Sequence, residues 1–317
     1  MKNKKTYLVT GGAGFIGSHL CEALLQKGNK VICLDNLSSG KMVNIAGIKK
    51  NKDFVFIKGD ANKLKDLKPI FKKNKLDGVF HYGAVVGVKR TLENPLAVLK
   101  DIDGIKHIAE LSLKYGKPKV VFASSSEVYG EPKELPERED GIIDAKMPYA
   151  AVKLIGEKFL EAYWQRHGLE TCSLRFFNVY GPRQESSDYG FVVGIFIKQV
   201  LAGRSPTVFG DGKGTRDFVY MQDNVEAGIK AMEFDKSAGH VINIGKGNPI
   251  TILDLANKVI ESCGQKGKIK PVFIENTRVD IKHRAPEISN MVNLLDFKPA
   301  VSLEDGLKET INYYKNI

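Results

Sequence analysis

A tyrosine and a lysine four residues apart are the first residues in this chain that could do chemistry together. Tyr149 and Lys153 lie in the segment PYAAVK, which opens a helix-like stretch. An i, i+4 spacing places two side chains on the same face of a helix. A phenol with a pKa of about 10 is a poor base at neutral pH, but an adjacent ammonium group stabilises the phenolate and lowers that pKa. The pair could therefore move a proton, although this spacing alone is common and usually has no function.

A run of three serines gives a second candidate. Ser124, Ser125 and Ser126 follow the strand-like run VVFA and precede Glu127. Ligands of a doubly wound sheet bind at the carboxyl ends of its strands, so a hydroxyl here could bond a substrate oxygen as its proton leaves. A polar strand exit with no catalytic role would have the same sequence.

A glycine-rich segment, TGGAGFIG, runs from Thr10 to Gly17 between a strand-like run and a helix. Glycine is needed because a side chain would block the tight turn, the approach of a pyrophosphate or the packing of the helix. The helix N-terminus then offers free N–H groups to the phosphates. Asp35 ends the second strand, where a carboxylate accepts hydrogen bonds from ribose hydroxyls and repels a 2′-phosphate, so NAD is favoured over NADP. Asp60, at the end of the third strand, could hold the adenine amino group or could be a solvated acid.

The elements that must position these residues alternate along the first half. The predicted strands are Thr6–Thr10, Lys30–Asp35, Phe54–Lys58, Gly78–Tyr82, Val120–Ala123 and Thr171–Phe176. The clearest predicted helices are Phe15–Lys27, Leu96–Tyr115 and Tyr149–His167. Continuous apolar runs such as VICL are typical of buried parallel strands. The pattern predicts an α/β fold, a doubly wound parallel Rossmann sheet with helices on both faces.

The regular alternation ends near Phe176. Loops rich in Gly, Pro, Asp and Ser then separate shorter helices, predicted at Gly194–Ala202, Asn224–Glu233 and Ile252–Ser262. We expect an NAD-binding Rossmann domain over residues 1–175, with residues 218–234 packing back on it. Residues 176–317 are expected to form a smaller α/β substrate domain.

Composition narrows the class of protein. Apolar residues make up 43% and charged residues 27%, which is ordinary for a globular chain. The net charge of +11 comes mainly from scattered lysines. These predict a solvated surface or a field that favours a phosphorylated substrate, and not a nucleic-acid reader. No 18 apolar residues occur in a row, and the four cysteines lack metal-like spacing. We therefore expect no metal, no membrane span and a cytoplasmic protein.

Several motifs together resemble the extended short-chain dehydrogenase/reductase family, in its nucleotide-sugar epimerase and dehydratase branch. They are TGGAGFIGSHL, LDNLSSG, SSSEVYG, PYAAVK, RFFNVYGPRQ and FGDGKGTRDFVYMQDNVEAG. The resemblance implies that Tyr149 removes the proton of the sugar 4-OH, that Ser125 steadies the oxygen, and that Lys153 holds the nicotinamide ribose and lowers the Tyr149 pKa. Hydride then passes to NAD, giving a 4-keto sugar. The cofactor contacts implied are Gly11, Gly14, Phe15, Ile16, Gly17, Asp35, Asn36, Asp60, Ala61, Tyr149 and Lys153.

The same resemblance suggests how a nucleotide-diphosphate sugar is held. Ser126 and Asn178 are expected at the sugar or diphosphate, and Val208 lies in a segment that resembles the base-contacting strand. Arg216 and Arg278 resemble diphosphate arginines, because a guanidinium donates two bonds to phosphate at once. Arg216 could instead form a surface pair with Asp217, and Arg278 could be solvated. Helices Leu96–Tyr115 and Tyr149–His167 resemble those that pair across a homodimer.

Three departures from the family pattern leave the outcome of the reaction open. Asp101 stands where the family often has Asn. The usual R-x-G-D stretch is one residue short at Arg278-Val279-Asp280. Glu127 stands where epimerases often have a small residue, and it resembles the acid–base glutamate of 4,6-dehydratases and sugar-acid decarboxylases. A solvated loop acid is the alternative.

The leading hypothesis is a nucleotide-sugar 4-epimerase that works through a transient 4-keto sugar. A 4-dehydrogenase, or a 4,6-dehydratase or decarboxylase that uses Glu127, is the alternative. Against that alternative, a dTDP-glucose dehydratase would have Asp at Ser126, and the GDP-mannose type prefers NADP. A decarboxylase would approach Tyr149 through a different sequence. A non-catalytic dinucleotide sensor is more remote, because it would not need Ser125, Tyr149 and Lys153 together.

Overall fold

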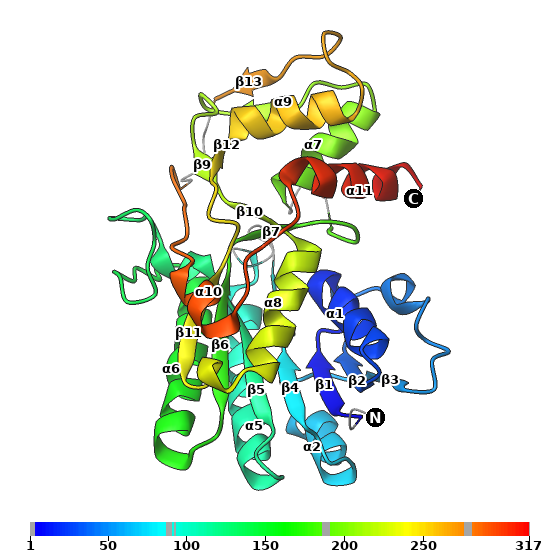
Figure 1. The fold of residues 1–317 in the computed structure, drawn as a ribbon, viewed down its shortest axis with the longest axis vertical. Coiled ribbons are helices and arrows are strands. Elements are labelled where there is room, and N and C mark those ends of the chain that lie inside the picture. Colours follow the sequence, from blue (N-terminus) through cyan, green and yellow to red (C-terminus); the bar gives the residue numbers. More distant parts are fainter. Residues whose placement is uncertain (1–3, 87–90, 92, 186–190, 276–280, 317) are drawn as a thin grey trace.

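A seven-stranded sheet forms the base of the molecule (Figure 1). The structure is a computed structural model, and it describes residues 4–86, 91, 93–185, 191–275 and 281–316. The strand order is β11-β6-β5-β4-β1-β2-β3, and each neighbouring pair is parallel. The strands are β1 (Thr6–Thr10), β2 (Lys30–Asp35), β3 (Phe54–Lys58), β4 (Gly78–His81), β5 (Lys119–Ser125), β6 (Thr171–Phe176) and β11 (His240–Ile244). The predicted parallel Rossmann sheet is confirmed.

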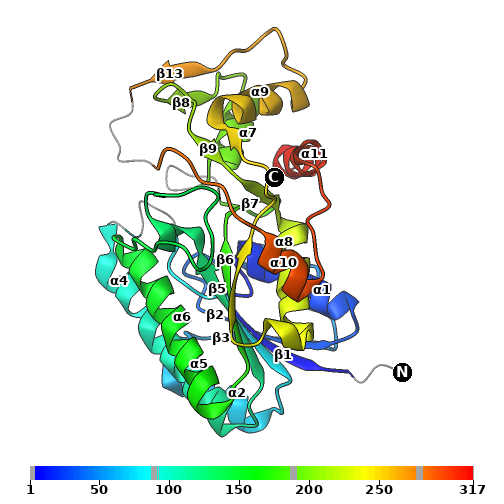
Figure 2. The same cartoon turned by 60° about the vertical axis from the view of Figure 1, so that its left-hand side comes forward.

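Helices cover both faces of this sheet (Figure 2). On one face lie α2 (Leu64–Lys73), α4 (Pro95–Leu99), α5 (Asp101–Lys114) and α6 (Pro148–His167). On the other face lie α1 (Phe15–Gln26), α8 (Met221–Glu233) and α10 (Ser289–Leu295). Successive strand residues alternate between the two cores: Val9 packs in the α1 and α8 layer, and Leu8 packs in the α2 and α5 layer. Burial on both faces explains why the strands read as unbroken apolar runs.

Most predicted strands and helices agree with the observed bounds to within a few residues, with one error. The predicted helix Leu96–Tyr115 is wrong, because the chain forms two helices that meet at Lys100. Helix α5 begins at Asp101, whose carboxylate accepts hydrogen bonds from the Val85 N–H and the Asn62 amide. These long-range bonds fix where α5 starts, and local periodicity does not encode them.

The second half of the chain supplies a smaller unit above the sheet and also returns to it (Figure 1). Its elements are β7 (Asn178–Tyr180), α7 (Val192–Leu201), β8 (Thr207–Phe209), β9 (Thr215–Arg216), β10 (Phe218–Tyr220), β12 (Ile250–Thr251), α9 (Ile252–Ser262), β13 (Val272–Ile274) and α11 (Leu303–Lys315). Short 3-10 turns lie at Met42–Ile45, Ser126–Tyr129 and Asp235–Ser237. Helix α8 packs against α1, and β11 adds the seventh strand beside β6. The sequence analysis did not identify β11.

None of the helices in the described ranges has the length and apolar character needed to span a membrane.

Candidate active site

A cavity of about 420 Å³ opens where the strands of the sheet end, next to the point at which strand order reverses between β1 and β4. This volume lies within the range of about 300–1,000 Å³ that is typical of small-molecule sites. Open α/β sheets bind ligands at this switch point. The predicted site residues that line the cavity are Gly11, Gly14, Phe15, Ile16, Gly17, Asp35, Asn36, Asp60, Ala61, Ser125, Ser126, Glu127, Tyr149, Lys153 and Asn178.

The glycine-rich loop forms one wall, and two of its glycines are sterically required. Gly11 has φ +68°, and a Cβ there would lie 2.7 Å from the Gly83 Cα, two residues after β4. A Cβ on Gly17 would lie 2.2 Å from the Gly11 carbonyl oxygen. Helix α1 begins at Phe15, and no side chain of the described residues caps it at Gly14. Its first N–H groups therefore remain available to a phosphate, which fits a dinucleotide.

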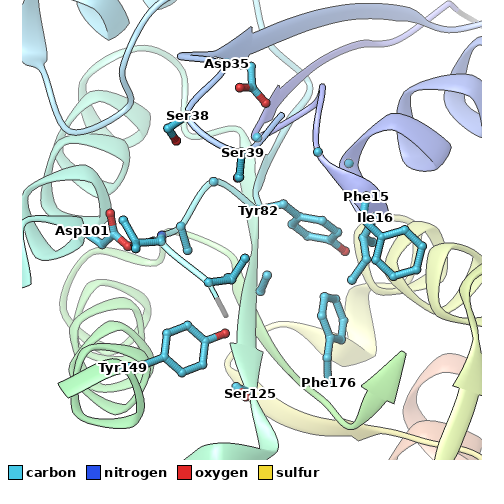
Figure 3. A pocket seen from close by; sticks show the side chains of 18 of the residues that line it. Phe15, Ile16, Asp35, Ser38, Ser39, Tyr82, Asp101, Ser125, Tyr149 and Phe176 are labelled. Carbon is cyan, nitrogen blue, oxygen red and sulfur yellow. Dashed lines mark hydrogen bonds between the residues drawn. The ribbon is translucent and has the colours of Figure 1, made fainter. Parts of the chain in front are cut away.

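Asp35 lies at the far end of the cavity from Tyr149 and Ser125 (Figure 3). Its side chain is buried, and its two carboxylate oxygens accept the Ala13 N–H at 2.9 Å and the Leu37 N–H at 2.7 Å. Each oxygen keeps a second lone pair for a ligand hydroxyl. A fixed negative charge at this point suits the ribose of NAD and repels the 2′-phosphate of NADP. The donor and acceptor set of the cavity thus fits NAD.

Tyr149 and Ser125 come from different elements and meet over the cavity. Tyr149 is the second residue of α6, which Pro148 opens, and Ser125 ends β5. Burial raises the pKa of Tyr149 above its usual value, and a hydrogen bond with the Ser125 hydroxyl opposes that rise. The Ser125 oxygen also accepts the Glu127 N–H at 3.2 Å. The protein alone therefore holds a protonated phenol beside a fixed hydroxyl.

Lys153 lies beneath Tyr149 on the same helix. Its Nζ donates to the Ala123 carbonyl oxygen at 2.7 Å and lies 5.5 Å from the centroid of the Tyr149 ring. Burial lowers the pKa of Lys153 to about 8, while the charges of Asp101 and Glu157 raise it. With a pKa of about 8 the ammonium group is mostly charged at neutral pH, and the two carboxylates favour that charged form.

Asp101 also lines the cavity, beside the Asn62 and Val85 groups that it binds. Its oxygens accept the Asn62 Nδ2 at 2.9 Å and the Val85 N–H at 2.8 Å. Burial raises the pKa of Asp101, and these two hydrogen bonds and the charge of Lys153 lower it. The acid thus places negative charge near the Tyr149 and Lys153 pair.

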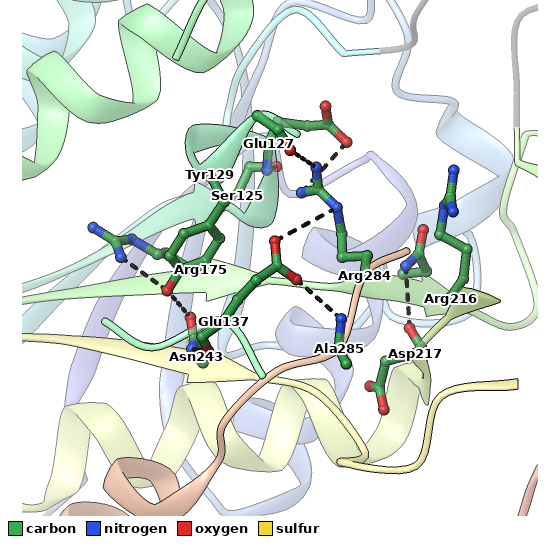
Figure 4. Close-up of polar contacts among 12 residues, drawn as sticks. Ser125, Glu127, Tyr129, Glu137, Arg175, Arg216, Asp217, Asn243, Arg284 and Ala285 are labelled. Atoms are coloured by element: carbon green, nitrogen blue, oxygen red, sulfur yellow. Dashed lines mark hydrogen bonds and ion pairs between the residues drawn. The ribbon is translucent and has the colours of Figure 1, made fainter. Parts of the chain in front are cut away.

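Glu127 faces a buried arginine that the sequence analysis did not select (Figure 4). Arg284 is almost fully buried, and its Nη1 lies 3.8 Å from Glu127 Oε1. Its Nη2 donates to the Gly130 carbonyl oxygen at 3.0 Å, and its Nε lies 3.9 Å from Glu137 Oε1. Burial raises the pKa of Glu137 to about 7, whereas the charge of Arg284 and the Ala285 N–H lower it. The Glu127 side chain is itself 48% exposed, so it is a largely solvated acid that contacts a buried arginine.

The residues predicted to bind substrate divide into those at the cavity and those away from it. Asn178 lies at the cavity wall, where its amide donates to the Asp217 carbonyl oxygen at 3.2 Å. Val208 and Arg216 are not among the lining residues: Val208 is fully buried in the upper unit, and Arg216 donates to the Thr215 and Lys282 carbonyl oxygens. Arg278 lies outside the described residues.

The alternative of an Arg216–Asp217 surface pair is wrong, because Asp217 is fully buried. Its carboxylate accepts the Lys246 N–H at 2.5 Å and the Asn248 N–H at 2.7 Å.

Two functional candidates had weak signals in the sequence. The segment Arg284-Ala285-Pro286-Glu287 keeps the arginine-to-acid spacing of R-x-G-D, with Pro in place of Gly, and this could have been found. Glu157 lies four residues after Lys153, which places a charged residue on the buried face of α6.

Comparisons with known proteins place these features in context. The model of the NAD dependent epimerase/dehydratase family matches residues 7–245. A UDP-N-acetyl-alpha-D-glucosaminuronate decarboxylase of Bacillus cytotoxicus is 37% identical, with 99% of each chain covered. A UDP-glucose 4-epimerase of Mycolicibacterium smegmatis is 34% identical, with 98% of each covered. Among solved structures, the UDP-N-acetylglucosamine 4-epimerase of Methanobrevibacter ruminantium M1, in complex with UDP-N-acetylmuramic acid, superposes with a TM-score of 0.92. It is 36% identical, with 99% of each chain covered.

Proposed function

This chain belongs to the NAD dependent epimerase/dehydratase family, and from that membership we propose that it is a 4-epimerase of a UDP-linked sugar. It is an NAD-dependent nucleotide-sugar enzyme. One observation supports oxidation and reduction at C4: Ser125, Tyr149 and Lys153 lie together at one end of a cavity whose other end holds the glycine-rich loop and Asp35. The relatives with epimerase names act on UDP-sugars, and this supports uridine diphosphate as the carrier.

In the proposed mechanism, the Tyr149 oxygen takes the proton of the sugar 4-OH. Ser125 donates to that substrate oxygen and keeps it at the phenol. NAD, held by the glycine-rich loop and Asp35, would supply the hydride acceptor and donor at C4 and a positive charge beside the phenol. Lys153 adds a second positive charge beneath the ring, which favours the phenolate. After the 4-keto sugar turns its other face, Tyr149 returns the proton to the oxygen, and the configuration at C4 is inverted.

We propose that the diphosphate and base extend from this point toward the upper unit. Ser126 and Asn178 are the groups that we assign to the sugar and diphosphate, because both line the cavity. Roles for Val208, Arg216 and Arg278 in holding the nucleotide stay predictions.

The test is product analysis with a panel of nucleotide sugars. The purified protein is incubated with UDP-glucose, UDP-N-acetylglucosamine and UDP-glucuronic acid, and the products are identified by NMR. We expect the C4 epimer of one of them. If none of these sugars changes, and no other nucleotide sugar does, the chain is a dinucleotide sensor and the proposal is wrong.

Decarboxylation or dehydration through Glu127 is the second candidate, and a specific observation favours it. Glu127 lines the cavity and pairs with the buried Arg284, so an acid and a cation lie near the catalytic hydroxyls. The relative from Bacillus cytotoxicus carries a decarboxylase name. Release of CO2 from a UDP-uronic acid, or a 4-keto-6-deoxy product, would select this reaction over epimerisation.

We also propose that the enzyme is a cytoplasmic homodimer. Helices α4 and α6 lie side by side and expose Leu96, Leu99 and Ile155, which supports an apolar contact between two copies. The four cysteines are free thiols, as is usual in a reducing compartment. Light scattering at micromolar protein should give twice the chain mass of 35.1 kDa, and the mass of one chain would refute the dimer.

A further inference from the structure

A buried acid lies one helical turn beyond Lys153 on α6, outside the set of groups used in the proposed mechanism. Glu157 is 1% exposed, and three hydrogen bonds hold its carboxylate. Ser124 Oγ donates to its Oε1 at 2.5 Å. Arg175, from β6, donates to Oε1 through Nε at 2.9 Å and to Oε2 through Nη2 at 2.7 Å. A buried charge pair is costly to desolvate, so its retention here points to a need for a defined geometry.

Arg175 also contacts Tyr129, which ends the segment that begins with the serines (Figure 4). Arg175 Nη1 donates to the Tyr129 hydroxyl oxygen at 2.9 Å, and the Tyr129 hydroxyl donates to Asn243 Oδ1 at 2.7 Å. The segment from Ser124 to Tyr129 is thus tied at both ends, by Glu157 at its start and by Arg175 and Asn243 at its end. Ser125 lies between these two anchors.

We propose that Glu157 is a positioning residue that holds the C-terminal end of β5 against α6. It thereby keeps the Ser125 hydroxyl within hydrogen-bond reach of the Tyr149 phenol. This inference rests on the roles proposed for Ser125, Tyr149 and Lys153. The argument is geometric: Tyr149, Lys153 and Glu157 share one helix, and Glu157 bonds the residue next to Ser125. A shift of about 1 Å in such a pair can cost a factor of 10² in rate.

Glu157 also contributes charge to the site. Among the described residues, the charged and titratable groups around Lys153 include Tyr149 and Glu157 on its own helix, Asp101 on α5 and His81 on β4. Arg175 on β6 joins them through its ion pair with Glu157. Burial lowers the pKa of His81 to about 3, so His81 is neutral in the working range. Asp101 and Glu157 raise the pKa of Lys153. Removal of the Glu157 charge therefore lowers the pH at which Lys153 loses its proton.

The positioning role is tested first with Ser124→Ala, which keeps the Arg175–Glu157 ion pair and should therefore fold. We expect kcat to fall by about 10–100-fold, with KM and the pH profile of kcat unchanged. Ser112→Ala is the matched control. Ser112 is a buried serine in α5 whose hydroxyl has no hydrogen-bond partner among the described residues, and its removal should leave kcat unchanged.

The charge is tested with two substitutions of Glu157 itself. Glu157→Asp keeps the negative charge but is too short to bond both Ser124 and Arg175, so kcat should fall while the alkaline limb of the profile stays in place. Glu157→Gln should lower kcat and also move the alkaline limb to lower pH. If either variant does not fold, Ser124→Ala still decides the positioning role.

The outcomes separate this inference from the proposed function. Wild-type kcat in Ser124→Ala would overturn the positioning role even though the wild-type enzyme turns over its nucleotide sugar. An alkaline limb that does not move in folded Glu157→Gln would overturn the charge role. A wild-type protein that turns over no nucleotide sugar would overturn the proposed function instead.

Discussion

The Lys153 Nζ lies 5.5 Å from the centroid of the Tyr149 ring, and it donates a hydrogen bond to the Ala123 carbonyl oxygen at 2.7 Å. The lysine therefore acts on the phenol through its charge and makes its own hydrogen bond to the strand that carries the serines. This arrangement ties α6 to the end of β5. It also makes the charge of Lys153 essential to the acid–base cycle that we propose.

Removal of the phenol oxygen should abolish proton transfer without removing substrate binding. We expect Tyr149→Phe to lower kcat by at least about 10²-fold, the usual scale for the loss of an acid–base group. Tyr163→Phe, on the same helix but away from the cavity, is the control and should keep wild-type kcat. Near-normal turnover by Tyr149→Phe would refute the assigned role.

The charge of Lys153 predicts the pH dependence of turnover. Its pKa is lowered to about 8 by burial, so the ammonium group is present below about pH 8 and is lost above it. We expect kcat to decline as the pH rises through about 8. Lys153→Arg, whose guanidinium stays charged, should lose this alkaline limb even if its overall rate is lower. If kcat of Lys153→Arg still declines above about pH 8, the decline is caused by the titration of another group.

Asp35 should set the preference for NAD. Asp35→Asn removes the charge that accepts ribose hydroxyls, and we expect NAD to bind roughly 10–100-fold more weakly, the scale of one or two charge-assisted hydrogen bonds. The affinity for NADP should fall less than the affinity for NAD, because the substitution relieves the repulsion between the carboxylate and the 2′-phosphate. Calorimetric titration of both cofactors measures the two changes. Asp53→Asn, at an acid outside the cavity that pairs with Lys4, is the control. An equal loss for NAD and NADP would contradict the account.

Glu137 should make stability depend on pH in an unusual direction. Its folded-state pKa is raised from 4.5 to about 7, so between these values the folded protein binds more protons than the unfolded chain. The free energy of unfolding should therefore fall as the pH rises from 4.5 to 7, and this residue's share is about 3 kcal/mol. Urea unfolding at several pH values should give a more negative slope for the wild type than for Glu137→Gln. Parallel slopes would show that Glu137 does not titrate in this way.

Glu127 separates the two candidate reactions. An epimerase has no proton to move at C5, so Glu127→Gln should keep most of its activity. A dehydratase or decarboxylase that uses this acid should lose at least about 10²-fold. Turnover of the same nucleotide sugar by the variant and the wild type measures the difference.

The predicted site residues that the structure brings together at the cavity are mostly those with local signals. Gly11 and Gly17 are required by the turn that follows β1, and Asp35 ends β2, so strand, turn and helix lie within one continuous stretch. Tyr149 and Lys153 are one turn apart on a helix. In each case the residues that define the geometry are close in the chain.

The parts that were missed depend on contacts between distant segments. Arg284 contacts Glu127 from a segment more than 150 residues later in the chain, and Arg175 contacts Glu157 from strand β6. The start of α5 depends on Asp101 binding Asn62 and Val85. Strand β11 joins the sheet beside β6 after more than sixty intervening residues, which include the upper-unit elements β7 to β10 and helix α8. Hydrophobic periodicity encodes which face of an element is buried, but not which distant polar group it meets.

The most direct test of the account is turnover of the nucleotide sugar in D2O, followed by NMR of the product. An epimerase that removes and returns the same hydride at C4 gives a C4 epimer that carries protium at C4 and at C5. Deuterium at C5 or C6, or loss of C6 as CO2, would show that the chemistry proceeds past the keto sugar. Either of these results would contradict the proposed epimerase.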